Sequence, residues 1–186
     1  MSATSPLNPL HERLLVSRAQ RGDSEAFRFL VKAYDTRLRY FVRRFVFDEH
    51  RAADLLQEVW LDVFRGLSRL KSNTAFRCWI YQIAHDKAVS QTRRERREAE
   101  IIDAIVPEES VGSVEEFTRI EQAESVHRAL QKLSDDHRAA LTLRFLEDMP
   151  IGEIAQVLRV PEGTVKSRLY HAKESMRNVL REESLE

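Results

Sequence analysis

The segment from residue 161 to residue 173 carries side chains that could bind a polyanion. Small, hydrogen-bonding and cationic residues follow one another there within two helical turns: Gly163, Thr164, Lys166, Ser167 and Arg168. A helix that enters the major groove of DNA needs this order, because small residues permit close approach, polar groups reach base edges and cations bind phosphates. An ordinary amphipathic helix with a solvated polar face shows the same periodicity, so the pattern alone leaves both interpretations open.

A second set of polar residues lies near residue 58. Asp54, Gln57, Glu58 and Asp62 are spaced three and four apart, which places them on one face of a helix. This face could dock on another protein or could simply be solvated. Nothing forces the carboxylates to converge, so we do not expect them to bind a metal.

A third stretch, residues 68–97, combines a polar loop with aromatic residues and then cations. Basic side chains bind phosphates without regard to sequence, and aromatic pockets can receive a base that has left the stack. By their type, Phe76, Trp79 and Ile80 fit a hydrophobic core better than a DNA contact. The cations are Lys87, Arg93, Arg94, Arg96 and Arg97.

Three amphipathic helices must position the last two sets. Apolar residues at spacings of three and four predict helices over about residues 24–47, 50–67 and 76–97, and Asp23 and Ser24 are suitable N-caps. Phe64 belongs to the apolar stripe of the second helix. Three such stripes can close one small core.

The C-terminal part shows a second helical pattern. Apolar residues from 126 onward mark four short helices, and a turn followed by Pro161 separates the last two, which is the pattern of a helix-turn-helix. Residues 98–124 contain Pro107, Gly112 and nine acidic residues against Arg119, which is typical of a linker. We therefore expect domains at 15–97 and 125–182, joined by an acidic linker at 98–124.

Composition supports an all-α protein with two small helical domains. The chain has 186 residues, 42% hydrophobic and 32% charged, with five Gly and five Pro. Its net charge of zero conceals a basic stretch at 20–97 and an acidic one at 98–127. No signal peptide or membrane span is evident, so we expect a cytoplasmic location. Cys78 has no partner for a disulfide, and we expect a small, buried apolar role for it.

Several motifs resemble those of bacterial sigma factors. Residues 153–172, which read EIAQVLRVPEGTVKSRLYHA, resemble the promoter-reading fourth region. Residues 54–64 (DLLQEVWLDVF) resemble the part of region two that docks on core RNA polymerase, and residues 76–84 (FRCWIYQIA) resemble the stretch that captures and melts the minus-ten element. The resemblance covers about residues 15–180. Because it shows two regions without an autoinhibitory N-terminal domain, it indicates the extracytoplasmic-function (ECF) type.

The resemblance implies roles for individual residues. The acidic set, Asp54, Gln57, Glu58 and Asp62, would dock on core RNA polymerase. The upstream, minus-thirty-five element would be bound by Gly163, Thr164, Lys166, Ser167, Arg168, His171 and Lys173. The minus-ten element would be bound by Lys71, Ser72, Asn73, Thr74, Tyr81, Gln82, His85, Asp86, Arg93, Arg94, Arg96 and Arg97, with the loop at 71–74 holding a flipped base.

Three residues depart from the family pattern. Arg159 stands where a turn glycine is usual, His171 where a permanent cation is commoner, and Asp86 where many relatives carry Asn or another uncharged group. A carboxylate at position 86 would repel phosphate, although it could accept a hydrogen bond from a cytosine amino group.

The resemblance implies core RNA polymerase and promoter DNA as partners, together with an anti-sigma factor, and no cofactor, metal or small-molecule substrate. A conventional helix-turn-helix regulator remains an alternative, but it would need a dimerisation surface or a ligand pocket. An enzyme would need a metal cluster, a phosphate loop or an activated nucleophile, none of which the sequence presents.

Overall fold

The protein is described by a computed structural model that covers residues 7–103, 129–130 and 132–183. Within these residues it is helical and has no strand. The N-terminal domain contains α1 (Pro9–Gln20), α2 (Ser24–Val42), α3 (Glu49–Gly66) and α4 (Phe76–Asp103), with 3-10 turns η1 (Leu67–Arg69) and η2 (Asn73–Ala75). The C-terminal domain contains α6 (Asp135–Leu141), the π-helical turn η3 (Thr142–Leu146), α7 (Ile151–Leu158) and α8 (Glu162–Glu183). The all-α prediction is confirmed.

Side-chain caps begin most of the helices. The carboxylate of Asp23 accepts hydrogen bonds from the backbone N–H groups of Glu25 and Ala26, both at 3.0 Å, as the sequence predicted. Asp48 caps α3 in the same way, and Ser134 caps α6. These bonds satisfy N–H groups that a helix start leaves without a partner.

The core of the N-terminal domain lies where the three predicted stripes meet. It is formed by Leu30, Leu38 and Phe41 of α2, Val59 and Val63 of α3, and Phe76 and Ile80 of α4, all with no more than traces of exposed surface. Phe64 corrects the prediction, because it is 66% exposed. Its ring lies edge-on to that of Phe27, with 5.4 Å between the two ring centroids.

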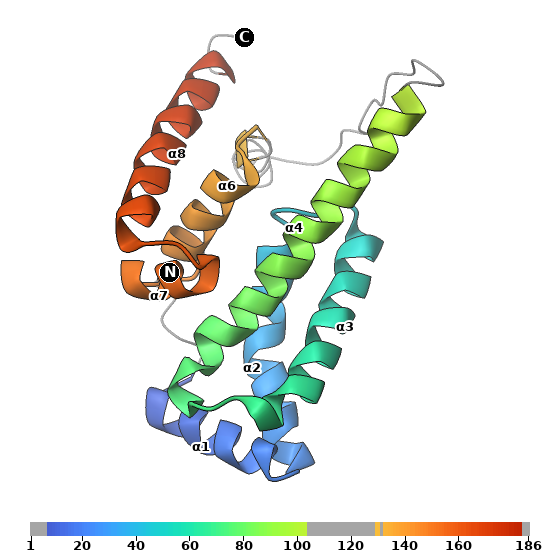
Figure 1. Cartoon of the computed structure of the whole chain (residues 1–186), viewed down its shortest axis with the longest axis vertical. Coiled ribbons are helices and arrows are strands. Elements are labelled where there is room, and N and C mark those ends of the chain that lie inside the picture. The colour runs from blue at the N-terminus through green and yellow to red at the C-terminus, as the bar shows by residue number, and fades with distance from the viewer. Residues whose placement is uncertain (1–6, 104–128, 131, 184–186) are drawn as a thin grey trace.

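Two features of the N-terminal domain differ from the predicted boundaries. The sequence did not predict α1, which packs on α2 and lies across one end of the domain (Figure 1). Helix α4 continues to Asp103, so the first six residues of the predicted linker are helical. The rest of the linker, and residues 125–128 of the next predicted helix, lie outside the described residues.

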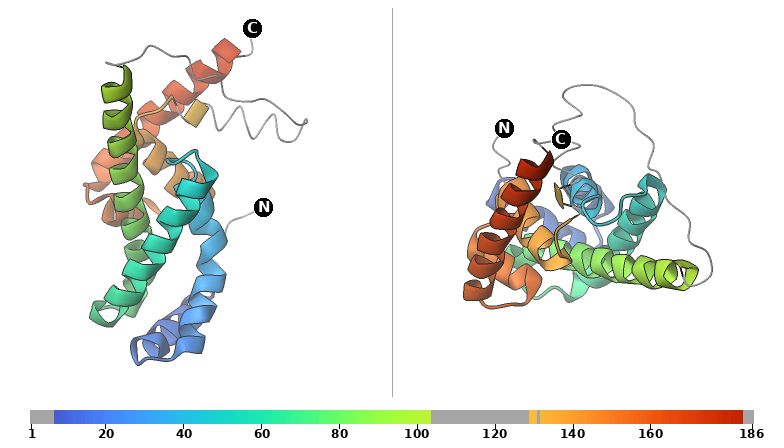
Figure 2. Two further views of the ribbon diagram at one scale, coloured as in Figure 1. Left: turned by 90° about the vertical axis from the view of Figure 1, so that its right-hand side faces the viewer. Right: turned by 90° about the horizontal axis from the view of Figure 1, so that it is seen from above.

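The two domains pack against each other along α4. One side of α4 contacts α3, and another contacts α7 (Figure 1). In both turned views, α6–α8 form one group beside the N-terminal helices (Figure 2). A single hydrophobic cluster runs through both domains, from Leu15 to Ala172. No helix in the described part of the chain is long and apolar enough to cross a membrane.

Candidate nucleic-acid interface

Helices α7 and α8 form the predicted helix-turn-helix, and Arg159 makes the turn between them. Its backbone is left-handed, with φ 54° and ψ 44°. The N–H of Arg159 donates to Gln156 O (3.4 Å) and the N–H of Val160 to Ala155 O (3.1 Å), which is the Schellman pattern of helix ends. Arg159 thus adopts the turn that glycine usually makes, at a conformational cost of about 1–2 kcal/mol.

Helix α8 buries one face and presents the other. Val165, Leu169 and Ala172 pack into the domain. Of the residues predicted to contact the upstream element, Gly163, Lys166, Ser167, His171 and Lys173 are exposed, and Thr164 and Arg168 are half-buried. Gly163 has open space around it, so a close approach by DNA meets no side chain there.

Arg168 and Tyr170 modify the predicted reading face. Arg168 Nη2 lies 2.6 Å from Asp136 Oδ2 of α6, so this cation is already held by a carboxylate. Tyr170 is 61% exposed, and its ring lies edge-on to His171. Tyr170 was not among the predicted DNA contacts. Its exposure makes it a candidate.

The polar loop at 71–74 is held by α1, the helix that the sequence did not predict. Gln20 Nε2 donates to Leu67 O (3.0 Å) and to Leu70 O (2.8 Å), just before the loop. Within the loop, the hydroxyls of Ser72 and Thr74 are hydrogen-bonded at 2.7 Å. Lys71, Ser72 and Thr74 are exposed, and Asn73 is half-buried.

Four of the predicted minus-ten residues, Tyr81, Gln82, His85 and Asp86, lie on the part of α4 that faces the C-terminal domain. Tyr81 is buried, and its hydroxyl donates to the carboxylate of Glu147. Gln82 Nε2 donates to Gln156 O at 3.4 Å. Asp86 Oδ2 lies 3.0 Å from Arg159 Nη2. Burial lowers the pKa of His85, although a hydrogen bond to Asp86 opposes this shift.

The predicted arginine run follows on the exposed end of α4. Arg93, Arg94, Arg96 and Arg97 are all exposed. Arg94 pairs with Glu98 on its own helix (2.9 Å), and Arg96 pairs with Asp135 of α6 (3.1 Å). A groove of about 560 Å³ is lined by His85, Asp86, Val89, Ser90, Arg93, Arg94 and Arg97. The groove therefore joins part of the run to His85 and Asp86.

The acidic set lies on α3, next to α4. Asp54, Gln57 and Glu58 are exposed, and Asp62 is half-buried. Lys87 of α4 reaches two of these carboxylates, with its Nζ 3.1 Å from Glu58 Oε2 and 3.0 Å from Asp62 Oδ2. These contacts raise the pKa of Lys87 against the opposing effect of partial burial. Lys87 thus binds to the acidic face, not to the surface around the arginine run.

Exposed apolar side chains extend the acidic face. Leu61 and Phe64 are 51% and 66% exposed on the same helix. Exposed large apolar groups beside charged ones are typical of protein-binding surfaces. The sequence assigned Phe64 to the core because its spacing matched the apolar stripe.

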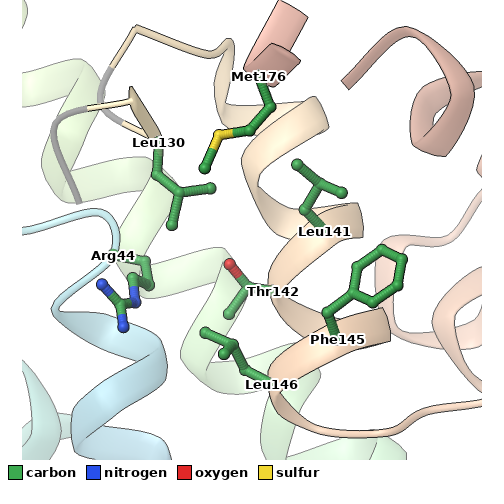
Figure 3. Close-up of a pocket in the computed structure, with 7 residues that line it drawn as sticks. All are labelled: Arg44, Leu130, Leu141, Thr142, Phe145, Leu146 and Met176. Atoms are coloured by element: carbon green, nitrogen blue, oxygen red, sulfur yellow. The ribbon is translucent and has the colours of Figure 1, made fainter. Parts of the chain in front are cut away.

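An apolar pocket of about 220 Å³ lies where α2, α6 and α8 meet. It is lined by Arg44, Leu130, Leu141, Thr142, Phe145, Leu146 and Met176 (Figure 3). Burial lowers the pKa of Arg44. None of the predicted DNA contacts lines this pocket.

Cys78 is half-buried in the N-terminal domain. Its burial raises the pKa of the thiol to about 11, which keeps it protonated near neutral pH.

The domain pair matches a known family of proteins. Residues 30–98 match Sigma-70 region 2, and residues 123–176 match Sigma-70, region 4. Together these matches cover well over half of the chain. The chain therefore belongs to the sigma-70 family of transcription initiation factors.

Similar proteins of known name indicate the subgroup of this family to which the chain belongs. It is 34% identical over 182 residues to the ECF RNA polymerase sigma-E factor of Escherichia coli K12, which covers 91% of this chain and 94% of that protein. It is also 34% identical over 180 residues to the RNA polymerase sigma-H factor of Pseudomonas aeruginosa, covering 91% and 93%. Within the sigma-70 family, the chain is an ECF sigma factor.

Solved structures support the fold. The structure of CnrH in complex with the cytosolic domain of CnrY has a TM-score of 0.73 at 24% identity, covering 92% of this chain and 97% of that one. The sigma factor RpoE of Bartonella quintana, in complex with the anti-sigma factor NepR, has a TM-score of 0.70 at 21% identity, covering 83% and 96%. At these identities the likeness concerns the fold alone.

Proposed function

We propose that this chain directs core RNA polymerase to promoters by using three separate surfaces. The acidic face of α3 docks on the polymerase, the outer face of α8 reads the upstream element, and the loop at 71–74 with α4 captures the downstream one. The observation that carries this proposal is the face of α8 on which Gly163, Lys166 and Ser167 are exposed, directly after the tight turn from α7.

The surfaces suit their proposed partners electrostatically. Lys166 and Lys173 lie two turns apart along one edge of the polar face of α8, where cations can bind phosphates beside a base contact. On α3, Lys87 holds one oxygen each of Glu58 and Asp62, which fixes both side chains while the carboxylates stay at the surface. Preordered side chains lose less conformational entropy on binding.

The proposal also covers the protein's chemistry, its location in the cell and a further partner. It performs no covalent chemistry of its own, needs no cofactor and works in the cytoplasm, where the polymerase is found. An anti-sigma factor is a further proposed partner, because the Bartonella quintana sigma factor of the same fold was solved in complex with one.

A run-off assay tests the function. The purified chain, added to bacterial core polymerase and fragments of the source genome, should give discrete promoter-dependent transcripts. Lys166→Ala combined with Arg168→Ala should abolish them while core binding in a pull-down persists, since the two surfaces lie on different domains. Absence of transcripts with a cognate core, or transcription without core, would show that the proposal is wrong. Loss of core binding in the double variant would contradict the division of roles.

A further inference from the structure

The apolar pocket between α2, α6 and α8 is built around the π-helical turn η3. Thr142, Phe145 and Leu146 of this turn all line the pocket (Figure 3). The N–H of Glu147 donates to Thr142 O at 3.2 Å, which closes the wide turn. Single π-helical turns within α-helices are rare and occur frequently at functional sites. The turn therefore draws attention to the cavity that its side chains surround.

Thr142 brings a buried hydroxyl to this pocket. Its side chain is 1% exposed, and Oγ1 has no hydrogen-bond partner among the residues that the structure describes. A helical threonine often donates to the carbonyl one turn earlier, but this hydroxyl points toward Leu130 and Arg44 (Figure 3). A buried hydroxyl without a partner costs free energy, and a ligand that accepts a hydrogen bond from it would recover that cost.

Arg44 supplies positive charge at one side of the pocket. It is half-buried, and burial, followed by the charge of Arg43, lowers its pKa. An anion close to a partly desolvated guanidinium favours the charged form. A carboxylate suits this position best among common anionic groups of small apolar molecules, because guanidinium and hydroxyl donors both form short, charge-assisted hydrogen bonds to it.

The remaining walls are apolar and continue into a second groove. Leu130 and Leu141 are buried, and Met176 is half-buried. A groove of about 420 Å³ shares Leu141 and Met176 with the pocket, and it is further lined by Lys173, Arg177 and Arg181. Long basic side chains can cover an apolar chain with their methylene stems. Among the described residues, no acidic one lines either cavity.

The size of the two cavities fits an amphiphilic molecule. Ligand sites typically enclose about 300–1,000 Å³. The pocket alone, at about 220 Å³, is smaller than this, whereas the pocket and the adjoining groove together fall within the range. Apolar walls with cations at both ends are complementary to an alkyl chain that carries a negative charge.

We propose that this pocket binds a free fatty acid as its carboxylate. The head group accepts hydrogen bonds from Thr142 and Arg44, and the alkyl chain lies over Leu141 and Met176 toward the groove. The inference goes beyond the proposed function, because it assigns a small-molecule ligand to a pocket that no proposed DNA contact lines.

Methyl NMR of the full chain measures binding at this site. The chain has three methionines, of which Met176 lines the pocket and Met149 is buried outside it. Octanoate, kept below its critical micelle concentration, should shift the Met176 methyl signal saturably and the Met149 signal much less. Met176→Leu assigns the signal. Octan-1-ol has the same chain length without the charge and should bind at least about tenfold more weakly.

Two substitutions test the head-group contacts. Thr142→Val keeps the shape of the side chain without its hydroxyl, so octanoate should bind about tenfold more weakly. The free energy of unfolding should not fall, because the hydroxyl has no described partner to lose. Arg44→Gln should also weaken octanoate about tenfold, but should leave octan-1-ol binding within about twofold.

Arg43→Gln is the matched control. Arg43 is also half-buried and adjacent in sequence, but it lies outside the pocket lining and pairs with Glu49 at 3.4 Å. Its substitution removes the same charge, and octanoate binding should change by less than about twofold because solvent and salt screen an indirect attraction.

The outcomes decide the proposal. A Met176 signal that does not shift saturably, or octan-1-ol that binds as tightly as octanoate, would overturn the carboxylate site. Equal weakening in Arg43→Gln and Arg44→Gln would show general attraction to cations and would overturn it too. If Arg44→Gln fails to fold, Thr142→Val and octan-1-ol decide. The titration contains neither polymerase nor DNA, so failure of the run-off assay concerns the proposed function alone.

Discussion

Arg138 offers a direct test of how the C-terminal domain is held together. Its side chain is 2% exposed, with Nε 2.8 Å from Leu130 O and Nη2 2.9 Å from Leu133 O. The guanidinium also lies 5.7 and 5.6 Å from the ring centroids of Phe45 and Phe47, just beyond the end of α2. Burial lowers the pKa of Arg138, against the effect of Asp135. One cation thus joins α6 to the preceding segment and to the other domain.

Arg138→Met should lower the free energy of unfolding by about 3 kcal/mol. The methionine can fill much of the space of the arginine stem, but it removes the side-chain donor of both carbonyls. Leu130 O keeps the backbone N–H of Leu133 at 3.2 Å, whereas Leu133 O loses the donor described for it, at about 1–3 kcal/mol. Loss of the two cation–π contacts adds about 0.5–2 kcal/mol each. Release of the guanidinium from burial offsets part of this sum, since burying an ion costs several kcal/mol.

Urea denaturation of the full chain measures the effect. Circular dichroism follows all helices, whereas tryptophan fluorescence follows Trp60 and Trp79, both in the N-terminal domain. Coincident transitions would show that the domains unfold together. Arg138→Lys is the control, because one ammonium keeps the charge but lacks the planar fork, so it should lose about 1–2 kcal/mol. A change below about 1 kcal/mol in Arg138→Met would refute the proposed role.

Three further predictions concern the surfaces and the junction. Lys166→Ala should weaken promoter binding by the polymerase complex to a similar degree for all sequences, and should reduce the slope of log affinity against log salt concentration by about one. Fluorescence anisotropy between about 50 and 200 mM salt measures both quantities. A loss of affinity that depends on the sequence would contradict a phosphate contact. Glu58→Gln combined with Asp62→Asn should weaken binding to core polymerase about tenfold in a titration. The free energy of unfolding should change by less than about 1 kcal/mol, because these ion pairs are largely exposed. Unchanged core binding would show that the acidic face is not part of the docking surface. Burial lowers the pKa of His85 from 6.5, so the unfolded chain binds more protons than the folded one near and below that pH. The free energy of unfolding should therefore fall as pH drops from about 7 to 5. His85→Asn should reduce this dependence on pH in urea titrations, and an equal dependence in both proteins would exclude His85 as its source.

The environment of His85 explains why the comparison must be made between variants. Asp86 of its own helix and Asp136 of α6 favour the protonated form, whereas burial and Arg168 of α8 oppose it. The buried carboxyl of Glu147 has a raised pKa, which acts in the opposite direction because its folded form takes up a proton more readily as pH falls. The difference between wild type and His85→Asn removes this contribution.

The helices that carry the site were predictable because their burial repeats with the helical period. Leu30, Leu38, Val59, Val63 and Ile80 lie in the core as their spacing indicated. Helix α1 escaped prediction because Leu10 and Leu14 are exposed, so its apolar residues form no clear stripe, although Asn8 caps it through Leu10 N–H. Periodicity also misplaced Phe64, since a stripe does not show where the opposing helix ends.

The contacts between the domains could not be predicted from periodicity. Tyr81 and Glu147 are separated by 66 positions, and each looks ordinary within its own helix or turn. Sequence pattern describes which face of a helix is apolar, but a buried pair of polar groups from two domains leaves no repeat. That Tyr81 binds DNA stays a prediction, and the structure places its buried hydroxyl against Glu147.

Arg159 and Asp86 show why residues that depart from a family pattern are best considered together. Taken singly, an arginine in a left-handed turn carries conformational strain, and a carboxylate on a DNA-facing helix repels phosphate. The structure places these two side chains 3.0 Å apart, where each charge offsets the other. Their exposure, 64% and 47%, limits the pair to less than about 1 kcal/mol, so it only partly offsets the strain of the turn.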